Sequence, residues 1–147
     1  MNTPILPPSP AASTAPRQSP VYPPPGKELV LKVCPMPADT NFNGDIFGGW
    51  VMSQVDLAGG VLPSRIIKGK LVTVAVKEFI FKQPVRPGDL VVFYANIQRI
   101  GNTSITVDVE VFSERVKTDE GFVKVTEATL TYVAIGEDGK PRQIHHP

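Results

Sequence analysis

Hydrophobic and polar residues alternate along five segments of this chain, and a two-residue period predicts β-strands. The segments are 27–33, 71–81, 90–100, 103–115 and 122–135. In the fourth segment, valine and isoleucine alternate with threonine, aspartate and glutamate, which suits a strand with one buried and one polar face. In the second segment Val72, Val74 and Val76 alternate with other residues, and we expect these valines to share a face.

A sixth segment, from about Gly48 to Leu62, is apolar around most of a helical circumference. Its apolar members are Trp50, Val51, Met52, Val55, Leu57, Ala58, Val61 and Leu62, and its few polar members are Ser53, Gln54 and Asp56. A helix with this pattern is buried on most sides. We expect Pro63 to end the helix or to kink its end.

The predicted order is one strand, one helix and four further strands. The composition of 84–89 predicts a turn, and Gly101-Asn102 predicts a two-residue hairpin. The sheet must bury one face, and the helix is the only partner for it, so the prediction is an α+β fold with an antiparallel five-stranded sheet wrapped round one long central helix. The helix is too apolar for one sheet to cover, and we therefore expect a homo-oligomer, a dimer at least.

The two ends of the chain lack these periodic patterns. Residues 1–26 hold nine of the sixteen prolines and a single charged side chain, Arg17, a composition that favours extended, unpacked chain. The sequence predicts a disordered tail at 1–26, one domain at 27–142 and a flexible C-terminus at 143–147. A signal peptide would need a basic start and a continuous apolar segment, which prolines interrupt here, so we expect a cytoplasmic protein.

Charge and reactive side chains exclude several classes of function. The formal net charge is +1, which predicts no bulk attraction to nucleic acid or to a membrane surface, and no stretch of about 18 apolar residues predicts a membrane span. Cys34 is the only cysteine and we expect a buried or half-buried structural thiol. The two histidines, His145 and His146, lie at the chain end, so neither a metal site nor a Ser-His-Asp triad is predicted.

Candidate chemistry lies just before the helix, where Asp45 is followed closely by Gly48-Gly49. The N-terminus of a helix carries free amides and a partial positive charge, and glycines leave those amides open. A carboxylate beside them suits attack on a polarised carbonyl, with the amides near Phe47, Gly48 and Gly49 as oxyanion donors. The structural alternative is that Asp45 only favours the turn and the helix start, as aspartates commonly do.

The segment from Pro37 to Asp56, PADTNFNGDIFGGWVMSQVD, resembles the opening motif of hotdog-fold acyl-CoA thioesterases, in particular the YciA-like group. Further matches follow in the same order at 72–74, 79–89, 101–104 and 126–128. The likeness extends from about residue 29 to residue 142 without an obvious gap, and only the proline-rich tail departs from it.

The resemblance implies hydrolysis of acyl-CoA to a free acid and CoA, with no cofactor besides the CoA of the substrate. Asp45 stands where this family has its catalytic acidic or amide residue, and it would act either as a general base on water or as a nucleophile that forms a transient anhydride. Asn43 would fix the loop or contact the thioester carbonyl. Homo-oligomers with sites between subunits are implied, and trimers of dimers are frequent in this family.

The sequence also offers candidates for binding the CoA portion of the substrate, but their sequence signals are less specific. Thr73, Thr103 and Ser104 would line the site and bind the pantetheine or the phosphates, although threonine is ordinary in strands. The phosphates call for basic side chains at the rim of the pocket. The candidates are Arg86, Arg99, Lys82, Arg115 and Lys117.

Two other classes of function stay open on the sequence. The hotdog fold also hosts dehydratases and hydratases of thioester-linked acyl chains, which place a histidine in the site, whereas this chain has no histidine in its core region. A module that binds acyl-CoA without turnover would keep the same motifs, and turnover assays separate it from an enzyme. The proline clusters of the tail would act as a spacer or bind a proline-recognising partner.

Overall fold

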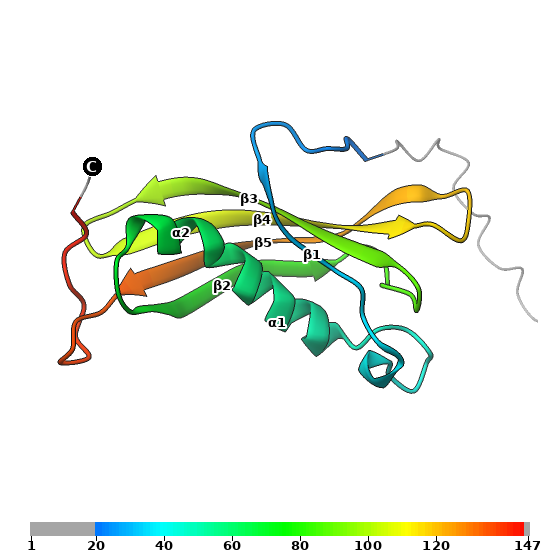
Figure 1. Ribbon diagram of the computed structural model, residues 1–147, viewed down its shortest axis with the longest axis horizontal. Helices are drawn as coiled ribbons and strands as arrows, with labels where there is room; N and C mark the ends of the chain where they lie inside the picture. The colour runs from blue at the N-terminus through cyan, green and yellow to red at the C-terminus, as the bar shows by residue number, and fades with distance from the viewer. Residues whose placement is uncertain (1–19, 146–147) are drawn as a thin grey trace, which may run out of the picture.

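The computed structural model describes residues 20–145, which form one antiparallel sheet with its helices on one face (Figure 1). The elements are β1 (Glu28–Val33), a 3-10 turn (Pro37–Asp39), α1 (Gly48–Gly59), α2 (Val61–Ile66), β2 (Leu71–Phe81), β3 (Leu90–Ile100), β4 (Ser104–Arg115) and β5 (Gly121–Ala134). The predicted fold, five antiparallel strands packed on one long helical segment, is confirmed, and every predicted strand is present within two residues of its expected bounds.

The core lies between α1 and the three central strands. Strand order in the sheet is β1-β3-β4-β5-β2, so β1 and β2 are the edges. Val51 and Val55 of α1 pack with Phe93, Val107 and other inward-facing residues, all of them buried. Each such side chain contributes about 1.5–3 kcal/mol by leaving water, which anchors α1 and therefore the loop that precedes it.

The helix does not run unbroken to Pro63, which corrects the prediction. It breaks at Gly60, and α2 continues through Pro63 to Ile66. Pro63 is the third residue of α2, where a backbone amide has no intrahelical acceptor, so its missing N–H removes no helical hydrogen bond. The adjacent Gly59 is buried, and a Cβ there would collide with the hydroxyl of Tyr132, which donates to Asp56 O at 2.7 Å.

Two β-bulges interrupt β2, and they overturn the expected strict alternation. The register with β5 shifts between Thr73 and Ala75 and again between Lys77 and Ile80. Residues opposite each other in a sheet share a face, so each bulge transfers the following side chains to the other face. Val72 lies opposite Val133, whereas Val76 lies opposite the core residue Leu130, so these two valines point to opposite faces.

The end of the predicted tail belongs to the folded domain. Tyr22 stacks on Phe122 with ring centroids 3.6 Å apart, and its hydroxyl lies 2.9 Å from that of Tyr94. These rings form a second cluster, with Phe112, on the sheet face away from the helices. The domain therefore begins before the expected boundary at 26/27, and the rest of the predicted tail, 1–19, lies outside the described residues.

The C-terminal boundary also shifts, because Ile144 is buried in the main core and its amide donates to Asn102 O at 2.7 Å. The predicted flexible end at 143–147 is thus wrong at Ile144, and residues 146–147 are outside the described range. Cys34, in contrast to the expectation, is exposed. No helix within residues 20–145 has the length and apolar character needed to cross a membrane.

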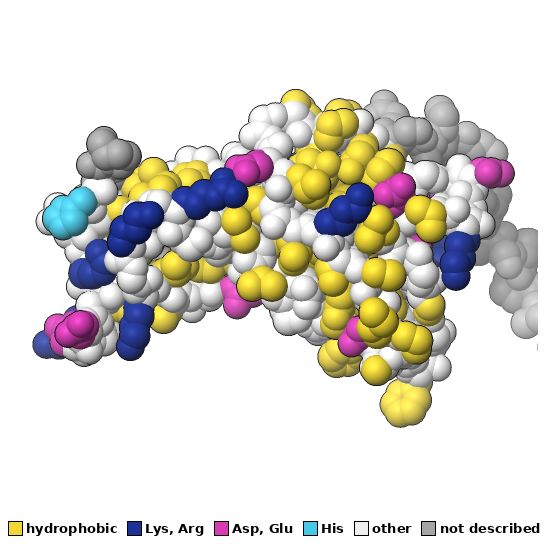
Figure 2. Space-filling view, viewed as in Figure 1, with side chains coloured by type: hydrophobic (Ala, Val, Ile, Leu, Met, Phe, Trp, Pro, Cys, Tyr) yellow, Lys and Arg dark blue, Asp and Glu magenta, His cyan; other side chains and the backbone are white. Residues whose placement is uncertain are grey.

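A single chain leaves a broad apolar surface exposed. On α1, Met52 and Leu57 are 48% and 61% exposed, so the helix is not buried on most sides within one chain. On the edge strand β2, Val76, Ile80 and Phe81 are also exposed. Figure 2 shows hydrophobic side chains concentrated on the half of this view that holds the start of α1 and the loop before it. Contiguous apolar surface of this kind marks an interaction site.

Candidate active site

Asn41 closes the short loop that carries Asp45. The Asn41 amide donates to Asp45 O at 2.8 Å, and Asn41 Oδ1 accepts from the amides of Asn43 and Asp45 at 2.9 and 3.2 Å. Gly44 has φ +82°, a left-handed conformation that glycine adopts without strain, and its amide donates to Asn41 O. The loop therefore depends on one asparagine side chain and one glycine.

The backbone after Asp45 is fastened to the rest of the domain. The Ile46 amide donates to Val85 O at 2.8 Å, and the side chains of both residues are buried in the main core. The Phe47 amide donates to Asp39 O at 2.6 Å. Hydrogen bonds thus hold the chain on both sides of the Asp45 side chain.

Asp45 lines a cavity of about 330 Å³ at the N-terminal end of α1. The lining residues are Asn41, Asp45, Ile46, Gly48, Val51, Phe81, Lys82, Gln83, Pro84 and Val85. Val51 and Phe81 give this cavity an apolar wall. Within residues 20–145, no side chain forms a hydrogen bond or an ion pair with the Asp45 carboxylate. The carboxylate is half-buried and faces open space.

The first turn of α1 supplies free amides beside this carboxylate. Phe47 is the N-cap, and its side chain does not cap the helix. In the described part of the chain, the amides of Gly48 and Gly49 have no hydrogen-bond acceptor, and Gly48 lines the cavity. The Phe47 amide is engaged with Asp39 O, so it is not available as the third donor that the sequence suggested.

Together these groups provide the chemistry that acyl transfer requires. A carboxylate can take a proton from water or attack a carbonyl carbon, and helix-terminal amides can stabilise the oxygen that gains negative charge. The apolar wall suits a hydrocarbon substituent on that carbonyl. The electrostatic contribution comes from the free amides and the helix dipole together.

The other candidate residues near the site have different partners. The Asn43 side chain is exposed, and only its backbone amide takes part in the loop. Thr73 lies farther along the helix, where its hydroxyl donates to Asp56 Oδ1 at 2.5 Å in an open groove of about 470 Å³ between the helices and β2. Burial, with the negative charge of Asp56 close by, raises the pKa of Tyr132 in this groove well above its usual range.

The candidate basic and hydroxyl residues are spread over two ends of the sheet. Arg86 lies in the turn before β3 and pairs with Glu120, and Lys82 lines the cavity. Arg115 is 3% exposed and fully engaged, so it is not a rim residue as the sequence suggested. Lys117 is exposed and lies near Gly88 in the same turn region.

Arg99, Thr103 and Ser104 lie at the β3–β4 hairpin, at the opposite end of the sheet from Asp45. Ser104 pairs with Val133 of β5, whereas the chain beside the cavity, at Lys82, hydrogen-bonds to Val125. Eight residues along a strand separate these two positions by roughly 26 Å. One chain alone therefore does not bring the hairpin residues to the Asp45 cavity.

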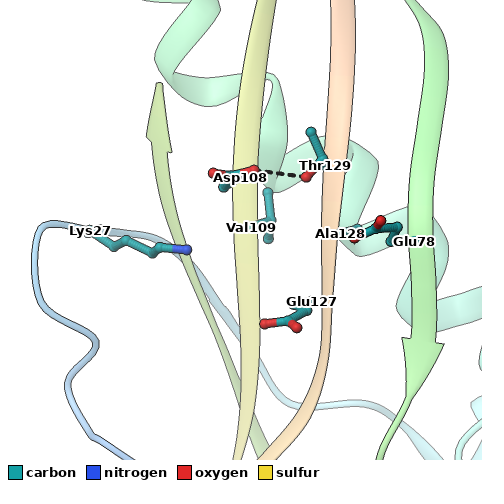
Figure 3. Close-up of a pocket in the computed structure, with 7 residues that line it drawn as sticks. All are labelled: Lys27, Glu78, Asp108, Val109, Glu127, Ala128 and Thr129. Atoms are coloured by element: carbon teal, nitrogen blue, oxygen red, sulfur yellow. Dashed lines mark hydrogen bonds between the residues drawn. The ribbon is translucent and has the colours of Figure 1, made fainter. Parts of the chain in front are cut away.

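A second hollow, of about 210 Å³, lies on the outer face of the sheet, away from the helices (Figure 3). Four charged side chains line it, Lys27, Glu78, Asp108 and Glu127, compared with Asp45 and Lys82 in the Asp45 cavity, and two of the four belong to ion pairs. Asp108 accepts from the Thr129 hydroxyl at 2.8 Å, and Lys27 pairs with Glu110. Lys124 bridges Glu110 and Glu127. No group of three or more potential metal ligands occurs within residues 20–145.

Sequence inspection missed Asn41 as the residue that closes the loop. The available signal was the pattern Asn-Phe-Asn-Gly-Asp, because asparagine side chains commonly accept hydrogen bonds from backbone amides two residues ahead. Two asparagines in this pattern compete for that role, and only the structure distinguishes Asn41 from Asn43.

Known proteins share both this sequence and this fold. A family model described as the thioesterase superfamily matches residues 43–119. The acyl-CoA thioester hydrolase YciA of Salmonella typhimurium is 48% identical over 122 residues, which cover 82% of this chain and 92% of that protein. A hexameric thioesterase from Yersinia pestis has a TM-score of 0.78 at 46% identity, over 84% of this chain and 99% of that chain.

Another solved relative is an aspartate-to-alanine mutant of a hexameric broad specificity acyl-coenzyme A thioesterase. Its TM-score is 0.76 at 41% identity, over 81% of this chain and 87% of that chain. The family model covers more than half of the present chain, and the relatives align along most of their own lengths. The chain therefore belongs to the thioesterase superfamily and has the hotdog fold.

Proposed function

We propose that this protein hydrolyses acyl-CoA thioesters to a free carboxylic acid and CoA, with Asp45 as the catalytic carboxylate. The observation that carries the proposal is the unpaired Asp45 side chain in a cavity shared with the first free amide of α1, Gly48. The family supports it, since the relative from Salmonella typhimurium is an acyl-CoA thioester hydrolase. The reaction needs no cofactor besides the CoA that is part of the substrate.

Hydrolysis at this site balances by either of two routes. In the first, Asp45 takes a proton from water, the resulting hydroxide adds to the thioester carbon, and the carbonyl electron pair moves onto oxygen. The Gly48 and Gly49 amides hold that oxyanion until the carbon–sulfur bond breaks, and the CoA thiolate then takes the proton from Asp45. In the second, Asp45 attacks the thioester carbon and displaces the CoA thiolate, which leaves a mixed anhydride. Water then hydrolyses the anhydride to the free acid and protonated Asp45, and the thiolate takes that proton.

The proposed assembly is a homo-oligomer with sites between subunits. Within residues 20–145 no strand pairs with the outer edge of β2, which also has exposed apolar side chains, including Val76 and Ile80. Leu57 of α1 is exposed as well. Antiparallel pairing of two β2 strands would cover this surface and give a continuous sheet. The solved relatives from Yersinia pestis and of broad specificity are hexameric, which supports three such dimers as the complete assembly.

Pairing through β2 also explains how the CoA-binding candidates would reach Asp45. Antiparallel strands place the Leu71 end of one β2 beside the Phe81 end of the other. Phe81 lines the Asp45 cavity, so the second copy would bring its Thr73 region and its β3–β4 hairpin, with Arg99, toward that cavity. Arg86 and Lys82 are the basic candidates from the same chain as Asp45.

Thiol release from acyl-CoAs of increasing chain length tests the activity. We expect turnover by the wild type and a loss of about 10²–10⁴-fold in Asp45→Ala, the usual contribution of an acid–base group. Asp108→Ala is a matched control, because it removes an aspartate carboxylate from the outer face of the sheet. Binding of acyl-CoA by the wild type without thiol release would overturn the proposal and favour a binding module.

Light scattering tests the assembly. Val76→Lys places a charge on the exposed edge strand and should lower the molar mass of the particle and its activity together. Val116→Lys is the control, because Val116 is 62% exposed and lies outside the strands, just after β4. An unchanged mass in Val76→Lys would exclude β2 as the interface.

A further inference from the structure

A buried charge cluster lies behind the Asp45 cavity and is not used in the reaction proposed above. Arg115 at the end of β4 and Asp89 just before β3 are 3% and 4% exposed. The Arg115 guanidinium donates to Asp89 Oδ2 at 3.4 Å, to Glu120 Oε1 at 3.2 Å and to Pro84 O at 2.7 Å. Burying charges is expensive unless every group has a partner, so such a cluster needs a structural or functional reason.

The cluster fastens the turn 84–89 at two points. Arg115 binds the carbonyl of Pro84, and Asp89 Oδ2 accepts from the Arg86 amide at 2.9 Å. Val85 lies between these two points, and its carbonyl accepts from the Ile46 amide at 2.8 Å. Arg115 is therefore connected to the peptide bond that follows Asp45 by two hydrogen bonds along the route through Pro84 and by three along the route through Asp89.

We infer that Arg115 and Asp89 are positioning residues for the Asp45 carboxylate. This inference rests on the proposed function of Asp45. The cluster holds Val85, Val85 holds the Ile46 amide, and that amide fixes the backbone from which the carboxylate extends. A catalytic group that is displaced by about 1 Å can lose about 10²-fold in rate, so a remote clamp affects catalysis more than binding.

Conservative substitutions of Arg115 and Asp89 test this positioning role without removing whole side chains from the core. Arg115→Lys keeps the charge but cannot donate to Pro84 O, Asp89 and Glu120 in the same geometry. Asp89→Asn keeps a side-chain oxygen for the Arg86 amide but weakens the link to Arg115. Glu120→Gln is the matched control, because it keeps a side-chain oxygen for the exposed contacts with Arg115 and Arg86 and leaves both attachments of the turn in place.

Two readouts are needed, steady-state kinetics with an acyl-CoA and amide hydrogen exchange of peptides that span residues 44–47. We expect Arg115→Lys to lower kcat by about 10–100-fold with KM within about twofold, and to speed exchange at 44–47 at least about threefold because the Ile46 amide loses a fixed acceptor. Asp89→Asn should change both readouts in the same direction by less, and Glu120→Gln should change neither.

Unchanged exchange at 44–47 in folded Arg115→Lys and Asp89→Asn would overturn the inference. A higher KM with an unchanged kcat in these variants would also overturn it. If Arg115→Lys does not fold, Asp89→Asn decides alone by the same criteria. The exchange measurement does not depend on turnover. If the wild type releases no thiol, the proposed function is wrong. The positioning role of Arg115 and Asp89 is still tested by hydrogen exchange at the Ile46 amide.

Discussion

The hollow on the outer face of the sheet and the Asp45 cavity differ in how their charged groups are paired. On the outer face, ion pairs join Lys27, before β1, to Glu110 of β4, and join Glu110 through Lys124 to Glu127, both of β5. At the start of α1, Asp45 has no partner side chain within residues 20–145, and the free groups near it are backbone amides. The outer hollow has more charge, much of it in ion pairs, whereas within the described residues the cavity at α1 places an unpaired carboxylate beside free backbone amides.

This difference shows what makes a site reactive. Charged side chains that form ion pairs with one another stabilise a surface. A carboxylate beside open helix-terminal amides has no such partner and can interact with a substrate. The unpaired state of Asp45 is itself supported by paired groups, because Asn41, Val85 and the Arg115 cluster hold its backbone. Three substitutions test whether the two regions differ in function as they differ in charge pairing.

The largest effect should follow removal of the free amide at Gly48. Proline has no N–H, and it is well tolerated at the first position of a helix. Phe47 has φ −58° and ψ 126°, a conformation that suits a residue before proline. We expect Gly48→Pro to fold and to lose about 10²–10³-fold in kcat, the usual effect of removing one oxyanion donor. Thiol release under saturating acyl-CoA measures this loss.

Gly48→Ala is the control that separates the amide from the added atoms. Its Cβ would lie 3.6 Å from the Phe81 ring, an ordinary contact, and the N–H remains. We expect Gly48→Ala to retain activity within about fivefold, less than the about 10²-fold expected for a lost donor. Equal losses in both variants would assign the effect to crowding near Phe81 and would remove Gly48 as a donor.

The next effect concerns the loop that presents Asp45. Asn41→Ala removes the acceptor of two backbone amides, whereas Asn43→Ala removes an exposed side chain with no bond in this loop. We expect Asn41→Ala to lower kcat about 10-fold or more through displacement of Asp45, and Asn43→Ala to stay near the wild type. The comparison of kcat in the two variants checks this assignment, and a larger loss in Asn43→Ala would reverse it.

Local patterns predicted most of the fold and the centre of the candidate site. The strand bounds followed from alternation, and the Asp45–Gly49 segment followed from turn and helix-start chemistry together with the family motif. Both kinds of signal act over a few residues. A hydrogen-bonded loop and the N-terminus of a helix are local structures, so their sequence is sufficient to indicate them.

Features that depend on distant partners could not be predicted in this way. Tyr22 belongs to the domain because Phe122 and Tyr94 offer a surface for it, and Arg115 is buried because Asp89 and Pro84 receive it. The bulges in β2 also could not be predicted, because the strand prediction assumed strict alternation. Each of these misses concerns a contact between segments that are far apart in the chain.

The smallest effect should follow disruption of the outer ion-pair network by Glu110→Gln. Burial raises the pKa of Glu110, but hydrogen bonds from Lys124 and Lys27 outweigh it and leave the pKa below its ordinary value of 4.5. The hydrogen bond from Lys124 likewise lowers the pKa of Glu127. For Lys124, burial lowers the pKa, but hydrogen bonds to Glu110 and Glu127 outweigh it and raise the pKa above 10.5.

A carboxyl with a lowered pKa stabilises the fold above its unfolded pKa, and this contribution disappears as the pH falls through the folded pKa. A raised lysine pKa stabilises below its unfolded value and is lost as the pH rises through the folded pKa. The network should therefore act between about pH 4.5 and 10.5. Within that window we expect Glu110→Gln to lower the free energy of unfolding by about 1 kcal/mol, because the ion pairs are partly exposed.

Chemical denaturation at several pH values and one fixed protein concentration measures this difference, since oligomer stability depends on concentration. The gap in the free energy of unfolding between the wild type and Glu110→Gln should shrink toward zero as the pH falls through the folded pKa of Glu110, which lies below 4.5. The value of kcat at pH 7 should be equal in the two proteins. A clear loss of kcat in Glu110→Gln would contradict the division between a structural outer face and a reactive cavity at α1. A gap that persists in acid would instead show that Glu110 stabilises the sheet by packing rather than by charge.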